Sequence, residues 1–131
     1  MRWRDRLEIG AACAVVPCLL ELVPATRALG WLARVPPRHG GAISPERLAF
    51  HVDRILHRAP WIWHHTCLRR AAVLAVLLRR DRRDADVVLG VRKRSDGSLE
   101  AHAWLRCGAE EPFLERGDIT PYERLVKATS E

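Results

Sequence analysis

The sequence feature that most constrains the fold of this chain is a strand–turn–strand pattern between residues 86 and 107. Residues 86–92 (DVVLGVR) form a continuous apolar run of the kind found in buried strands. Residues 95–98 (SDGS) follow, and an Asp-Gly pair supplies the positive φ angles that a hairpin turn requires. The returning run 99–107 alternates, with Ala101, Ala103, Leu105 and Cys107 on one face and His102, Trp104 and Arg106 on the other. This pattern predicts an antiparallel sheet. A third strand, interrupted by Pro112, is expected after the turn at Gly108-Ala109, whereas the tail from Ile119 is too short to assign.

Helices are expected before the sheet. Residues 3 to about 35 read as two helical stretches interrupted by Pro17 and Pro24. Ser44 and Pro45 suit the cap and first position of a helix to about Arg58, with a buried stripe of Ile43, Leu48, Val52, Ile55 and Leu56. A further helix is predicted from Cys67 to about Arg80, capped by Thr66, whose alanines allow close approach to a sheet. The predicted class is α+β, with N-terminal helices and a cysteine-bearing helix on a small antiparallel sheet.

The length and net charge of the chain argue against some classes of function. A chain of 131 residues is expected to form one domain. The net charge of +6 is spread along the chain, which argues against a nucleic-acid partner. The run 79–84 (RRDRRD) reads as a solvated helix end, with a surface for an acidic partner, peptide or lipid headgroup as the alternative.

The N-terminus resembles a signal peptide only superficially. Arg2, Arg4 and Arg6 precede an apolar run, but acidic residues and Pro17 interrupt the pattern, and the run is shorter than the ~20 residues of a membrane span. We expect a mature cytoplasmic segment, with contact to a membrane surface as the alternative.

Four cysteines lack the paired spacing of a zinc site or a disulfide scaffold. Cys13 and Cys18 lie in an apolar run and read as packed thiols, and Cys107 lies near the hairpin turn. His64, His65, Cys67 and His102 include the residue types of a zinc site, but they lack its usual paired spacing. No metal and no cofactor is expected.

Cys67 is a candidate nucleophile because it opens a helix. A helix N-terminus and a histidine cation both stabilise a thiolate, and the N–H groups of the first turn can bind an oxyanion. His102 is the candidate base. If Gly108-Ala109 is a two-residue loop, Cys107 pairs with Glu110, and counting outward places the orienting acid Glu115 opposite His102. A bulge at Pro112 would shift this register and favour Asp118 instead.

Two other interpretations of the same residues stay open. Taken alone, Cys67 reads as a buried structural thiol, and the chain then becomes a non-catalytic, basic helical adaptor. Trp61, Trp63, His64 and His65 either line a substrate groove, or assist the oxyanion, or pack beneath the helix.

Residues 60–116 resemble the lasso-peptide leader peptidases. The resemblance is carried by Pro60-Trp61, by Thr66-Cys67-Leu68 and its helix, by residues 89–93 (LGVRK) and by residues 101–104 (AHAW). That family belongs to the transglutaminase-like superfamily. A helix-opening Cys, a hairpin His and an acid follow here in the order found in papain-like and transglutaminase-like enzymes. The resemblance implies a helical part at 1–58, a catalytic core at 59–131, Cys67 as nucleophile and His102 as base. The family's Asp position holds Leu114 here, beside Glu115.

The resemblance also implies an activity and partners. It implies a cytoplasmic cysteine peptidase that removes the leader from a ribosomally made precursor before a separate cyclase closes the lasso. Members of similar length work with a small separate recognition protein, so the implied partners are the precursor, that protein and the cyclase. The basic N-terminal helices are candidates for docking. A transglutaminase-like acyl transferase would use the same residues.

Overall fold

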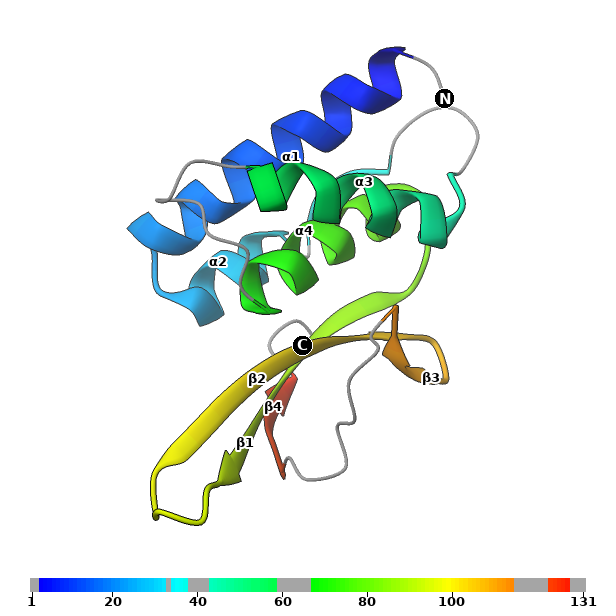
Figure 1. Ribbon diagram of the computed structural model, residues 1–131. Helices are drawn as coiled ribbons and strands as arrows, with labels where there is room; N and C mark the ends of the chain where they lie inside the picture. Colours follow the sequence, from blue (N-terminus) through cyan, green and yellow to red (C-terminus); the bar gives the residue numbers. More distant parts are fainter. Residues whose placement is uncertain (1–2, 33, 38–42, 59–66, 115–122, 128–131) are drawn as a thin grey trace.

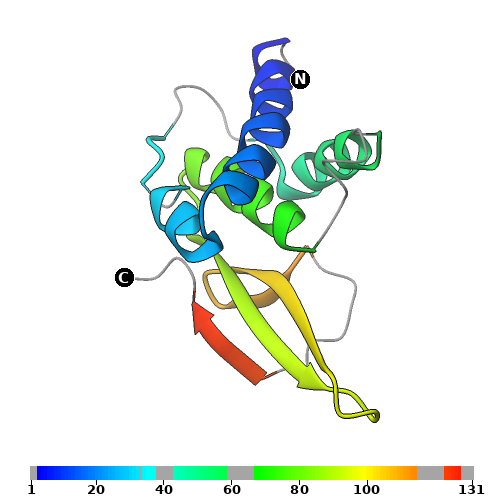
Figure 2. The same cartoon turned by 90° about the vertical axis from the view of Figure 1, so that its left-hand side faces the viewer.

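The computed structural model describes residues 3–32, 34–37, 43–58, 67–114 and 123–127, in which helices lie on one side of an antiparallel sheet (Figures 1 and 2). The helices are α1 (Trp3–Leu22), α2 (Ala25–Leu32), α3 (Pro45–Arg58) and α4 (Cys67–Arg80). The strands are β1 (Ala85–Lys93), β2 (Leu99–Cys107), β3 (Glu110–Phe113) and β4 (Glu123–Lys127), in the spatial order β3-β2-β1-β4. The predicted α+β class is confirmed, as are the start and end of the cysteine-bearing helix α4.

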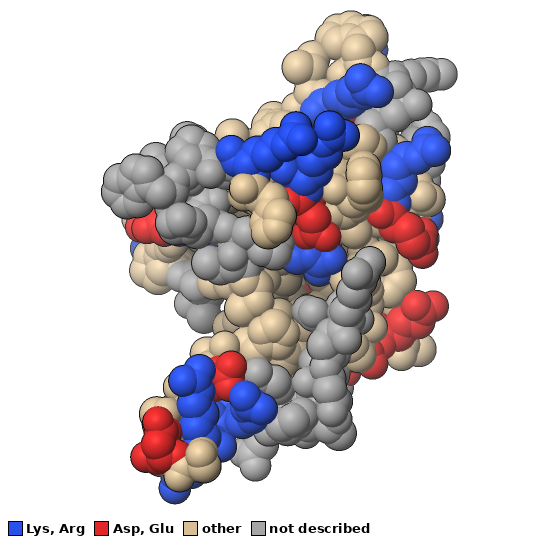
Figure 3. Space-filling model, in the orientation of Figure 1, with Lys and Arg blue, Asp and Glu red and all other residues tan. Residues whose placement is uncertain are grey.

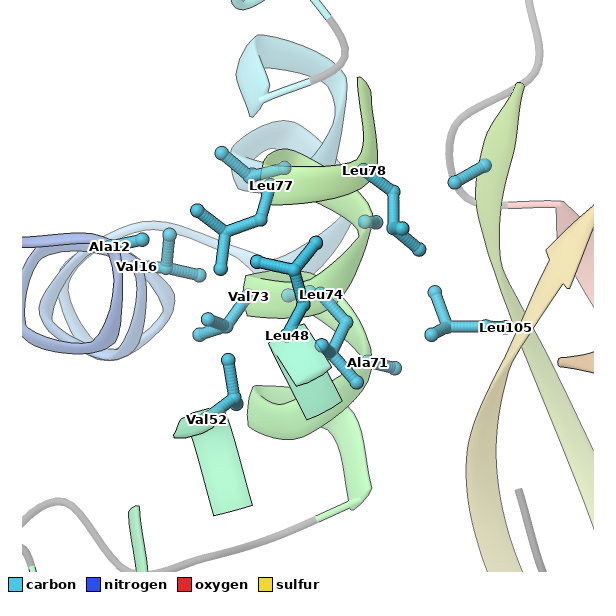
Figure 4. Packing of buried hydrophobic residues seen from close by; sticks show 14 of the residues in the cluster. Ala12, Val16, Leu48, Val52, Ala71, Val73, Leu74, Leu77, Leu78 and Leu105 are labelled. Carbon is cyan, nitrogen blue, oxygen red and sulfur yellow. The ribbon is translucent and has the colours of Figure 1, made fainter. Parts of the chain in front are cut away.

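Helix α4 is the centre of the hydrophobic core. Every side chain from residue 71 to residue 78 is buried, between α1 and α3 on one side and the sheet on the other. Figure 4 shows Ala12 and Val16 of α1 on one side of α4, and Leu105 of β2 pointing toward it from the other. The alanines of α4 allow this sandwiching, because a small side chain lets a helix approach both layers closely.

The start of α3 follows its local sequence. The Arg47 N–H donates to Ser44 Oγ at 3.3 Å, so Ser44 caps the helix as predicted. The predicted buried stripe is largely confirmed, but Ile55 is 36% exposed and Ala49 is buried instead. The buried face is centred on Val52 and Leu56, and Ile55 lies at its rim.

The prediction that Pro17 interrupts the first helix is wrong. Helix α1 runs through Pro17 without a break, although a proline inside a helix removes one backbone hydrogen bond. Ile9, Cys13 and Val16 before it, and Pro17 itself, are all buried. Packing of the turns on both sides against the core therefore outweighs the lost bond.

The hairpin is wider than a two-residue turn. Lys93 pairs with Leu99, so residues 94–98 form the connection. Only Gly97 has a positive φ, of 90°, while the Asp96 carboxylate accepts hydrogen bonds from the Ser98 N–H at 2.9 Å and the Ser98 hydroxyl at 2.6 Å. The turn is thus held by a side-chain bond to the backbone.

The charged C-terminal end of α4 forms hydrogen bonds and ion pairs with neighbouring elements, in contrast to the solvated helix end that the sequence suggests. Arg79 Nη2 donates to Asp86 Oδ1 at 3.1 Å, and Arg79 Nε donates to the Ala85 carbonyl at 2.7 Å. Arg80 pairs with Glu8 of α1. The Ile43 N–H donates to Asp81 Oδ2 at 3.1 Å. These groups fasten α4 to its neighbours.

Candidate functional site

Cys67 is the first residue of α4 and is half-buried against the edge of the core. The first N–H groups of a helix have no partner within the helix, so this position carries partial positive charge and donors that can meet an anion. Its predicted cap, Thr66, lies outside the described residues. The local setting that the thiolate hypothesis requires, a cysteine at a helix N-terminus, is present.

Two arginines after Cys67 fix the first turn of α4. Arg70 Nε donates to Asp53 Oδ1 of α3 at 2.7 Å, and Arg70 Nη2 donates to the Leu114 carbonyl at 2.9 Å. Arg69 pairs with Glu21 of α1. The first turn is thereby tied to α1, to α3 and to the end of β3.

Sequence reasoning missed these positioning residues. A helix macrodipole disfavours cations in the first turn, yet α4 places Arg69 and Arg70 there. A local rule broken in this way signals that specific partners compensate elsewhere in the fold. Here the partners are the carboxylates of Glu21 and Asp53.

His102 lies on β2 directly opposite Gly90 of β1 and is half-buried. Its ring centroid is 6.0 Å from that of Trp104, two residues along the same face. Trp104 is 1% exposed and donates from Nε1 to Glu111 Oε1 at 3.1 Å. The predicted alternation of β2 is confirmed, because Ala103 and Leu105 join the core cluster that contains α4.

The two candidate catalytic residues therefore lie on neighbouring elements but in different orientations. Helix α4 packs against β2, which brings the element carrying Cys67 to the strand carrying His102. Alternation directs Ala103 and Leu105 toward α4, and it directs His102 to the opposite face of the sheet. The pairing of Cys67 with His102 stays a prediction.

The face of His102 is held by a buried ion-pair network. Asp86, 8% exposed, accepts from Arg79 of α4 at 3.1 Å and from Arg106 of β2 at 2.6 Å. Asp86 and Arg106 are directly opposed in the β1–β2 register. The network joins the end of α4 to the two strands that position His102.

The third residue of the predicted triad lies beyond β3. Cys107 pairs with Glu110 as predicted, but Leu105 pairs with Phe113, so the register shifts between these two pairs. The count that placed Glu115 opposite His102 assumes an uninterrupted register, and this shift interrupts it. Glu115 and Asp118 lie outside the described residues, and both stay candidates for the orienting acid.

Several other predicted groups lie outside the described residues, namely Trp61, Trp63, His64 and His65. In the part of the chain that the structure describes, no three His, Cys, Asp or Glu side chains are arranged to hold a metal ion.

Burial raises the pKa of the Cys13 thiol to about 12, with a further contribution from the Asp53 carboxylate. Burial also raises the pKa of Cys107. No helix within the described ranges has the length and apolar character needed to cross a membrane.

Comparison with known proteins identifies the family. No curated protein and no solved structure matches the chain. The transglutaminase-like superfamily, which generally contains cysteine-protease-like enzymes, matches residues 12–127, from within α1 to the end of β4. The match spans the helical part and the sheet together. The chain therefore belongs to the transglutaminase-like superfamily.

Proposed function

We propose that this protein is a cysteine peptidase that removes the leader from a ribosomally made lasso-peptide precursor through an acyl-enzyme. Membership of the transglutaminase-like superfamily supports cysteine-protease or acyl-transferase chemistry. The observation that carries the proposal is Cys67 at the N-terminus of a helix that packs on the strand bearing His102.

The chemistry follows from those positions. The Cys67 thiolate attacks the scissile carbonyl, and the N–H groups of the first turn of α4 stabilise the oxyanion. His102 gives its proton to the leaving amine, which departs with one peptide fragment and leaves the other as a thioester. His102 then takes a proton from water as the water attacks the thioester, which releases the acid and regenerates the Cys67 thiolate and the protonated His102. Glu115 or Asp118 would orient the imidazole.

Because strand alternation directs His102 away from α4, the proposed pair requires the imidazole to reach Cys67 around an edge of the sheet. Among the described strands, β3 flanks β2 only from Leu105 to Cys107, whereas His102 lies beyond the end of that pairing. The backbone at His102 is thus bordered by a described strand on the β1 side alone. The Cys67 side chain leans toward the N-terminus of α4, and in this proposal the imidazole meets it there.

The lasso-specific part of the proposal rests on the resemblance of residues 60–116 and on no other observation. It assigns the precursor as substrate, a separate recognition protein and the cyclase as partners, and the cytoplasm as the compartment. A basic surface on the helices suits docking. Burial and the nearby cations Arg6, Arg47 and Arg54 lower the pKa of His51, and Figure 3 shows Arg side chains over the helical layer and a second basic group on the β1–β2 hairpin.

The test is mass spectrometry of a precursor encoded beside this chain, incubated with its recognition protein. Wild type and the matched control Cys107→Ala should release the leader, and Cys67→Ala should not. Equal cleavage by Cys67→Ala would remove this thiol from the mechanism. Absence of cleavage by wild type would refute the peptidase assignment for that precursor.

The same assay separates hydrolysis from acyl transfer, which the family match supports equally. Capture of the thioester by water adds the mass of water across the two fragments. Capture of a glutamine-derived thioester by an amine instead loses ammonia from a chain that stays intact. A mass change of the second kind that depends on Cys67 would assign the protein as a transferase.

A further inference from the structure

Helix α1 is apolar on two opposite sides. One side packs into the core through Ile9, Ala12, Cys13, Val16 and Pro17. The other carries an outer stripe, defined as Trp3, Leu7, Ala11, Ala14, Cys18 and Leu22. Trp3, Leu7 and Leu22 are 67%, 61% and 83% exposed. A contiguous exposed apolar surface on a helix whose opposite side is already buried marks an interaction site, so the outer stripe is expected to have a partner.

The outer stripe is symmetric along the helix. Its residues are separated by four, four, three, four and four positions, so the spacing reads the same from either end. The centre of symmetry lies between Ala12 and Cys13. A twofold rotation about an axis perpendicular to the helix at this centre exchanges the position of Trp3 with that of Leu22, Leu7 with Cys18, and Ala11 with Ala14. A twofold interface requires such a self-complementary surface.

Side-chain sizes along the outer stripe fit a paired helix. Ala11 and Ala14 at the centre are exposed and small, with Val15, 61% exposed, beside them, while bulky Trp3 and Leu22 lie at the ends. In an antiparallel pair, Trp3 of each copy meets Leu22 of the other.

Charge at the two ends agrees with an antiparallel arrangement. Arg4 lies at the N-terminal end of the outer stripe, and Glu21 lies at its C-terminal end, where it pairs with Arg69 and keeps 58% of its side chain exposed. Antiparallel packing brings each positive end beside a negative end, and it also opposes the two helix macrodipoles. A parallel pair would place like charges together.

We propose that α1 pairs with α1 of a second copy of this chain, antiparallel and about a twofold axis at the centre of the outer stripe. Figure 1 shows α1 along the rim of the helical layer, away from the sheet, so the pairing leaves α4 and β2 uncovered. The 20 residues of α1 give a contact about 30 Å long. One helix pair is a modest interface, so the dimer forms in a concentration-dependent equilibrium.

Sedimentation of the full-length chain tests the pairing. Wild type should shift from 14.9 kDa toward twice that mass as its concentration rises. Leu7→Arg should stay monomeric, and Phe50→Arg on α3 should dimerise like wild type. These two positions are matched, with 61% and 62% exposure. A wild type that stays monomeric, or a Phe50→Arg variant that loses the dimer equally, overturns the proposal.

A disulfide tests the register. The twofold places Leu7 of one copy opposite Cys18 of the other, whereas the two Leu7 positions lie about 16 Å apart along the axis, too far for a disulfide. Leu7→Cys should therefore give covalent dimers on mild oxidation with diamide, and Leu7→Cys combined with Cys18→Ala should give none. Dimers that persist without Cys18 indicate a parallel pair and overturn the antiparallel arrangement. Binding of wild type to anionic vesicles with no dimer in solution would assign the outer stripe to a membrane instead.

Discussion

Replacing Asp86 by Ala tests how the end of α4 is fastened to the sheet. Asp86 is 8% exposed and accepts from two guanidinium groups, Arg79 at 3.1 Å and Arg106 at 2.6 Å. Their side chains are 12% and 21% exposed, so water replaces the carboxylate only in part. The variant leaves two like charges close together, with their shared acceptor removed.

The expected loss can be worked from these contacts. A hydrogen bond to a charged group contributes about 1.5–3 kcal/mol to stability, and Asp86 accepts two of them. Removing one partner of a buried ion pair costs about 3–5 kcal/mol. We expect Asp86→Ala to lower the free energy of unfolding by about 3 kcal/mol, a large part of the ~5–15 kcal/mol of a typical domain.

Guanidinium denaturation followed by circular dichroism measures this loss, with Asp84→Ala as the control. Asp84 lies in the same turn and is exposed, so its truncation should cost less than about 0.5 kcal/mol. Asp86→Asn keeps the shape and removes the charge, and it should fall between the two. If Asp86→Ala loses less than about 1 kcal/mol, or no more than Asp84→Ala, the network does not hold α4 to the sheet.

Three further outcomes are expected. Leu74→Ala, at a fully buried position of α4, should lower the free energy of unfolding by about 3 kcal/mol in the same assay, and a loss under about 1 kcal/mol would contradict its burial. Iodoacetamide at pH 7 should alkylate Cys67 faster than Cys107 and Cys13. Burial raises the pKa of both Cys107 and Cys13, that of Cys13 to about 12, so these two thiols should react slowly. Equal alkylation rates, measured by peptide mapping, would argue against an activated Cys67. The Arg92 and Arg94 cations lower the pKa of Glu100 in the folded protein below its value in the unfolded chain. The ion pair therefore stabilises the hairpin fully at pH values above the pKa of the unfolded chain, and this stabilisation is lost as the pH falls through the pKa of the folded protein. The protection factors of β1 and β2 amides, which correct for the intrinsic exchange rate at each pH, should therefore fall on acidification in wild type but not in Glu100→Gln; unchanged wild-type protection factors would count against the pair.

Local signals in the sequence predicted the elements that they control. The Ser44-Pro45 pair marked the start of α3, and the alternation after Gly97 marked β2 and its two faces. Each of these depends on neighbours within a few residues, so the sequence contains the needed information. Pro17 shows the limit: its local effect is unfavourable, and only the packing of α1 on α4 explains why the helix continues.

Long-range contacts account for what was missed. Strand β4 pairs with β1, more than 30 residues earlier in the chain, and its five residues gave no local signal of their own. Arg70 likewise acts through Asp53 and Leu114, which are 17 and 44 residues away. Pairing at such distances depends on the assembled fold, and a single sequence reveals it only through oddities such as cations in a first helical turn.

Counting residues along the β2–β3 hairpin does not identify the orienting acid. Counting from the correct pair of Cys107 with Glu110 would oppose Leu105 with Pro112, but a proline has no N–H to donate, and Leu105 pairs with Phe113 instead. A shift of one residue moves every later side chain to the other face, so hairpin counting cannot choose between Glu115 and Asp118. The chain leaves β3 at Leu114, whose carbonyl accepts from Arg70 in the first turn of α4. The last described residue before both acids is therefore fastened to the first turn of the helix that carries Cys67.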